Sequence, residues 1–68
     1  MNQAKVLIVK KLKDITEDDV SKFDIILIRK PNGWYTTAKN KFDPIFKDKS
    51  NKEIGQIRKD GRYIVEER

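Results

Sequence analysis

The chain has 68 residues, contains no cysteine and no histidine, and carries a formal net charge of +5 with 40% charged residues. These absences exclude disulfide bonds, thiolate zinc sites and imidazole-based catalysis, and they imply no cofactor. The positive charge favours anionic partners, with nucleic acid first among them. Homo-oligomer formation is the remaining way for so short a chain to add buried surface.

The length predicts one small domain over residues 1–68, because a chain of this size buries only about 60% of its unfolded surface. No apolar stretch is long enough for a membrane span or a signal peptide, since the run from Val6 to Val9 covers only four residues between lysines. We therefore expect an intracellular, cytoplasmic protein without membrane association.

The first segment, Ala4 to Lys13, is expected to form a strand because of its β-branched Val-Leu-Ile-Val run. Thr16 then fits the N-cap of a short helix from Glu17 to Lys22, with acidic residues on its first turn. Consecutive acids on a helix point in different directions, so Glu17, Asp18 and Asp19 indicate helix capping and not a metal site.

The stretch from Phe23 to Lys39 is expected to form a hairpin. The apolar run from Ile25 to Ile28 predicts its first strand, and Pro31-Asn32-Gly33 its turn. A three-residue loop with Gly33 in a left-handed conformation is favoured, because a two-residue turn would put Pro31 at a paired position. This register places Arg29 opposite Tyr35.

Alternation along the hairpin predicts two unlike sides. One side is expected to be core capped by tryptophan, and it holds Ile26, Ile28, Lys30, Trp34, Thr36 and Ala38. The other is mixed, and it holds Ile25, Leu27, Arg29, Tyr35, Thr37 and Lys39.

The second half of the chain is less regular. Residues 42–46, broken by Pro44, predict an edge strand or an ordered loop. Glu53 to Lys59 and Arg62 to Glu66 are expected to pair as a final hairpin around Asp60-Gly61. A helix from Asn51 to Lys59 is the alternative, because Ser50 and Glu53 match a capping box, although Gly55 would lie inside it.

Short strands separated by turn signals predict a mainly β fold. The expected architecture is a small antiparallel SH3-like or related partly open barrel of about five strands, with one short helix after the first strand. An open α+β sheet covered by the short helix is the alternative.

Binding is the function that these residues favour over catalysis, because neither serine has an activating base and no glycine-rich phosphate loop is present. Cations beside aromatic rings suit the phosphates and bases of DNA or RNA. The candidate nucleic-acid-binding residues at the two hairpin tips are Arg29, Lys30, Trp34, Tyr35, Lys39, Arg58, Lys59 and Arg62.

A second hypothesis gives the candidate residues other roles. Trp34 and Tyr35 would pack across the sheet, and the lysines would deter association between sheet edges. The protein would then be a protein-binding accessory or regulatory module, of phage or mobile-element origin, that docks a partner through strand edges or the Trp34 tip.

Residues 58–63, Arg-Lys-Asp-Gly-Arg-Tyr, resemble the opening strand-turn-strand of the arm-site DNA-binding domain of tyrosine recombinases. More strands and a helix follow this motif in that family. The match covers six residues, so neither fold nor function is carried over from it.

Overall fold

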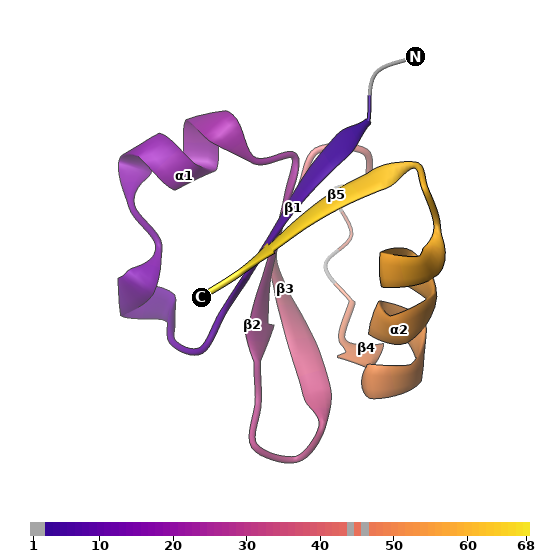
Figure 1. The fold of residues 1–68 in the computed structure, drawn as a ribbon. Coiled ribbons are helices and arrows are strands. Elements are labelled where there is room, and N and C mark those ends of the chain that lie inside the picture. Colours follow the sequence, from indigo (N-terminus) through magenta and orange to yellow (C-terminus); the bar gives the residue numbers. More distant parts are fainter. Residues whose placement is uncertain (1–2, 44, 46) are drawn as a thin grey trace.

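The computed structural model describes residues 3–43, 45 and 47–68 (Figure 1). In chain order, the elements are β1 (Ala4–Val9), the 3-10 turn η1 (Leu12–Asp14), α1 (Glu17–Lys22), β2 (Ile25–Arg29), β3 (Trp34–Asn40), β4 (Lys49–Ser50), α2 (Asn51–Lys59) and β5 (Tyr63–Glu67).

The strands form one five-stranded sheet in the order β4-β3-β2-β1-β5, so β4 and β5 are its edge strands. The sheet is strongly curled (Figure 1). The expected mainly β fold, the strand number and the helix after the first strand are confirmed. The purely antiparallel pairing is wrong, because β1 runs parallel to both β2 and β5. The reason is the crossover through α1, which returns the chain to the start of β1 before β2 begins.

Residues 51–59 form the helix α2, so the expected strand from Glu53 to Lys59 is wrong and the alternative is confirmed. The Ser50 side chain accepts a hydrogen bond from the Glu53 N–H, and the Glu53 carboxylate accepts one from the Ser50 N–H. This capping box, together with the burial of Ile54 against the sheet, outweighs the roughly 1 kcal/mol that Gly55 costs in a helix. Asp60-Gly61 therefore joins a helix to β5.

The helix α1 has the predicted bounds and the predicted cap. Thr16 Oγ1 accepts a hydrogen bond from the Asp19 N–H at 3.2 Å, and Asp19 Oδ2 accepts one from the Thr16 N–H at 3.0 Å. The preceding strand is shorter than expected and ends at Val9, because η1 closes a turn in which the Asp14 N–H donates to the Lys11 carbonyl.

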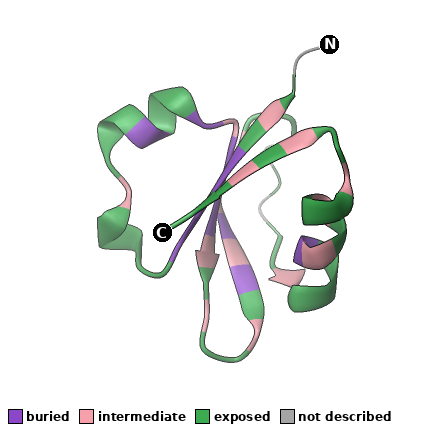
Figure 2. Cartoon of the chain, viewed as in Figure 1, coloured by how far each residue is buried: buried purple, intermediate pink, exposed green. Residues whose placement is uncertain are grey.

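The sheet is buried on both faces, which explains why β1 is purple along most of its length in Figure 2. The cluster on the α2 side consists of Val6, Ile8, Ile25, Leu27, Tyr35 and Ile54. The cluster on the other side consists of Leu7, Val9, Phe23 and Ile26. The expectation of one core side and one mixed side is therefore wrong, because α2 covers the side that was expected to be mixed.

The central hairpin has the predicted three-residue loop. Gly33 adopts a left-handed φ of 87°, and its N–H donates to the Lys30 carbonyl at 3.3 Å. Arg29 lies opposite Tyr35 as expected. Further along, Ile26 lies opposite Lys39 and not opposite Ala38, because β3 contains a bulge there.

The segment between β3 and β4 is a loop where it is described. The Asn40 side-chain oxygen accepts hydrogen bonds from the N–H groups of Phe42 and Asp43, and the Asp43 carboxylate accepts one from the Ile45 N–H. The expectation of an edge strand or ordered loop over 42–46 includes Pro44 and Phe46, which lie outside the described residues.

Candidate anion-binding surface

The carboxyl ends of β1, β2 and β5 lie at the same end of the sheet, because these three strands are parallel. In sheets of this kind, the space beyond the carboxyl ends of parallel strands is a common ligand site. Here it holds a groove of about 320 Å³, which we call the basic groove and which is lined by Lys10, Lys11, Arg29, Lys30 and Pro31.

A second hollow of about 190 Å³ adjoins the basic groove. Lys10 and Arg29 line both, and the hollow extends past Val9 to Glu67 and Arg68 at the end of β5. Together the two depressions form a surface that runs across the ends of three strands.

Most of the positive charge at the basic groove is not neutralised by the protein. Lys10, Lys11 and Arg29 are exposed, and no carboxylate of the described residues forms an ion pair with any of them. Lys30 differs, because its Nζ lies 3.0 Å from an Asp48 oxygen. Three free cations beside one groove are an electrostatic site for an anion.

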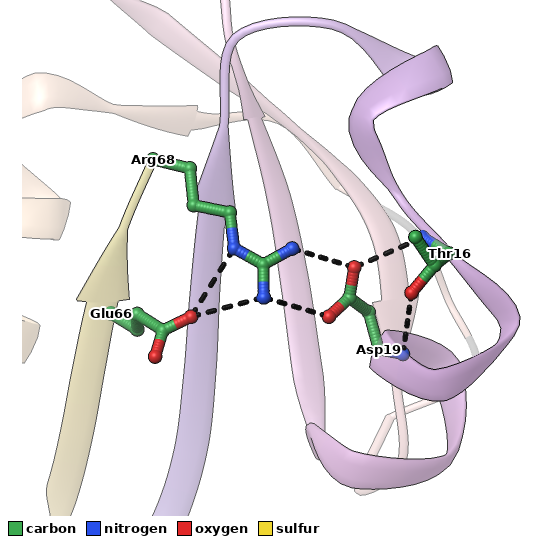
Figure 3. A network of polar contacts seen from close by, with 4 residues as sticks. All are labelled: Thr16, Asp19, Glu66 and Arg68. Carbon is green, nitrogen blue, oxygen red and sulfur yellow. Dashed lines mark hydrogen bonds and ion pairs between the residues drawn. The ribbon is translucent and has the colours of Figure 1, made fainter.

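Arg68, which lines the adjoining hollow, is already bound by acids (Figure 3). Its guanidinium donates to both oxygens of Asp19, at 2.7 and 2.9 Å, and to Glu66. The hydrogen bond from Arg68 is the main reason that the pKa of Asp19 falls to about 2. Because the Arg68 N–H also donates to the Ile8 carbonyl, this residue ties α1 to the end of β5.

This ion pair predicts an acid-sensitive contribution to stability. The pKa of Asp19 is lowered from 3.8 to about 2 in the folded state, so its ionised form stabilises the fold above about pH 4. The contribution is lost as the pH falls from about 4 to 2. We expect Arg68→Gln to melt below the unmodified protein at pH 6, and the difference to disappear near pH 2.

Thermal melts across this pH range, followed by circular dichroism, test the expectation. Arg58→Gln is the control, because it removes an equal charge from an exposed pair with Glu67. A melting difference for Arg68→Gln that stays constant down to pH 2 would show that Asp19 is not the titrating partner.

The first hairpin tip is only partly the surface that the sequence predicts. Arg29 and Lys30 line the basic groove, and Trp34 is 45% exposed. Tyr35 is buried, and its hydroxyl donates to Asn51 Oδ1 on α2 at 3.4 Å. Because α2 covers this face, the Tyr35 ring is not exposed for stacking on a base, and its position is that of a core residue.

Lys39 is also held by hydrogen bonds within the fold. Its ammonium group donates to the carbonyls of Val20 and Phe23, the latter at 2.8 Å. Carbonyls at a helix C-terminus lack partners within the helix and attract cations. In a regular strand, Lys39 would share one side of the sheet with Tyr35. The bulge in β3 turns Lys39 to the opposite side, toward α1.

The second tip lies at the other end of the sheet, because the Ala4 N–H at the start of β1 donates to the Arg62 carbonyl. Arg62 is bound by Asp60, which lowers the pKa of that carboxyl and raises the pKa of Arg62, and Arg58 pairs with Glu67. Lys59 is exposed at the end of α2. Arg62 is therefore separated from the basic groove by the length of the sheet, whereas the Arg58 side chain reaches Glu67, which lines the adjoining hollow.

The sequence prediction missed Lys10 and Lys11. Both follow the buried run of β1 directly, and basic residues after a buried strand are the signal that could have found them. The expected strand to Lys13 and the expected antiparallel pairing hid this signal, because antiparallel strands do not bring their carboxyl ends together.

No family model matches the chain, and no curated protein or solved structure matches it either. No structural neighbour therefore assigns the curled sheet to the SH3-like class. Within the described part of the chain, no helix is long and apolar enough to cross a membrane.

Proposed function

We propose that the protein binds nucleic acid without catalysis and that the basic groove contacts the phosphates. The observation that carries this proposal is the set of free cations, Lys10, Lys11 and Arg29, around one groove. Phosphate contacts from lysine and arginine supply most of the affinity in sequence-independent nucleic-acid binding. The net charge of +5 adds long-range attraction of the same sign.

An extended phosphate backbone fits this surface better than a single small anion. The free cations Lys10, Lys11 and Arg29 line an open groove and do not enclose one point. Lys10 and Arg29 also line the adjoining hollow, whose other charged residues are Glu67 and the paired Arg68. The described residues that line the basic groove include no aromatic ring and no amide side chain. We therefore expect weak preference for base sequence, because the proposed contacts go to phosphates, which carry no sequence information.

Binding of labelled single- and double-stranded DNA and RNA at 50 and 200 mM salt tests this function. With three to four phosphate contacts, counterion release predicts that affinity falls roughly 20- to 150-fold between the two salt concentrations. No binding at the lower salt concentration, or binding that does not depend on salt, would contradict the proposal.

A protein-binding role is the second candidate. The observation that favours it is the position of β5, which is an outer strand of the sheet and carries Ile64 with 47% of its surface exposed. An outer strand offers backbone groups to a partner strand, including one from a second copy of the chain. Sedimentation at rising concentration distinguishes self-association from a monomer.

A further inference from the structure

A separate groove of about 360 Å³ lies at the end of the sheet opposite the basic groove. We call it the aromatic groove and define it by Asn40, Phe42, Lys49, Ile57, Arg62 and Tyr63. Asn40 ends β3, Lys49 is in β4, Ile57 is in α2 and Tyr63 begins β5, whereas Phe42 lies in the loop after β3 and Arg62 in the turn before β5. The proposed phosphate surface uses none of them.

The floor of the aromatic groove is apolar. Ile25 lines it and is only 6% exposed, and Ile57 and Tyr63 pack against the same core cluster. The groove is therefore an opening into the core on the α2 side. Its volume is at the lower end of the range for small-molecule sites. An apolar floor favours the ring of a ligand over a hydrated ion.

Two aromatic side chains line this opening. Phe42 is 65% exposed, although the hydrogen bond from its N–H to the Asn40 side chain fixes its backbone. Tyr63 is half-buried at the start of β5. The exposed ring of Phe42 and the accessible part of the Tyr63 ring offer flat faces for a planar aromatic ligand.

The polar groups of the groove suit a ligand whose aromatic ring carries an anionic group. Lys49 has no ion-pair partner among the described residues. Arg62 is bound by Asp60 through Nε and Nη2, which orients the guanidinium and leaves Nη1 without a partner in the described part of the chain. The Asn40 oxygen accepts backbone hydrogen bonds, so its amide nitrogen is the part left to donate.

We propose that the aromatic groove binds a nucleotide. The base stacks on Phe42 and Tyr63, its edge accepts a hydrogen bond from Asn40, and the phosphate contacts Lys49 and Arg62. A fatty-acid carboxylate would contact the apolar floor of the groove and the cations, but it would use neither the flat faces of the rings nor the amide donor. A free nucleotide and one nucleotide of a strand present the same chemistry.

Nuclear magnetic resonance titration of the ¹⁵N-labelled protein tests the proposal. The probes are adenosine monophosphate, adenosine, inorganic phosphate, octanoate and a single-stranded tetranucleotide. We expect adenosine monophosphate to shift the amide signals of Phe42, Lys49 and Tyr63, with weaker binding of adenosine and of phosphate. Phe42→Ala is expected to weaken binding about tenfold, because stacking of a base on one ring has an effect of this size.

Matched variants separate this site from the basic groove. Lys49→Gln is expected to weaken binding of adenosine monophosphate severalfold, whereas Lys52→Gln, with the same charge change outside the groove, leaves it unchanged. Arg29→Gln is also expected to leave it unchanged while it weakens binding of longer nucleic acid. The nucleotide site can therefore fail without affecting the proposed function, and the reverse also holds.

Tighter binding of the tetranucleotide than of adenosine monophosphate at the same amides would identify a strand as the source of the nucleotide. Equal or weaker binding would identify the free nucleotide. No shift at these amides with millimolar adenosine monophosphate, equal shifts with phosphate alone, or preferential binding of octanoate would each overturn the proposal.

Discussion

Replacing Tyr35 by alanine is expected to lower the free energy of unfolding by about 3–5 kcal/mol, as for other large aromatic side chains removed from a core. Tyr35 is 2% exposed and packs in one cluster with Leu27 of β2 and Ile54 of α2. Its removal leaves a cavity between the sheet and α2. Because small domains have modest stability, we expect much of the variant to be unfolded.

The variant Tyr35→Phe separates this packing role from a role in binding. It keeps the ring and removes only the long hydrogen bond to Asn51, so we expect a loss of less than about 1 kcal/mol. Nucleic-acid binding should be unchanged. Urea denaturation followed by circular dichroism measures both variants, and a near-neutral Tyr35→Ala that loses binding would return Tyr35 to the binding surface.

Replacing Lys10, Lys11, Arg29 and Lys30 together by glutamine is expected to lower affinity for nucleic acid at least about 100-fold at low salt, because three to four phosphate contacts are lost. The salt dependence of the remaining binding should be shallow. All four positions lie at the surface or are only half-buried, so we expect the fold to persist.

A second fourfold variant provides the control for net charge. Lys22, Lys47, Lys52 and Lys59 are exposed, and none of them lines the basic groove. Their replacement by glutamine changes the net charge equally and should weaken binding only a few fold. Equal losses in the two variants would mean that total charge, and not the basic groove, determines affinity.

Local chemistry was sufficient to predict the features that depend on neighbouring residues. The Thr16 cap, the three-residue loop ending at Gly33 and the opposition of Arg29 and Tyr35 each follow from residues close together in the sequence. The Ser50 capping box was visible too, but the turn signal at Asp60-Gly61 favoured a hairpin. Such a signal marks a turn without stating whether a strand or a helix precedes it.

The sequence could not predict the features that depend on the path of the chain between elements. A continuous apolar run such as Ile25 to Ile28 is typical of a parallel strand buried on both faces, but a strand in the core of an antiparallel sandwich has the same run. The parallel pairing of β1 and β2 therefore went unpredicted, and with it the position of Lys10 beside Arg29. The bulge that turns Lys39 toward α1 likewise has no clear signal in the sequence.

The most direct test of the binding surface is a map of amide chemical shifts on addition of a ten-nucleotide single strand at 50 mM salt. The basic groove predicts that the largest shifts occur at residues 9–11 and 29–33, and that they are reversed by added salt. Shifts confined to residues 58–63, or no shifts, would contradict binding at the carboxyl ends of the parallel strands.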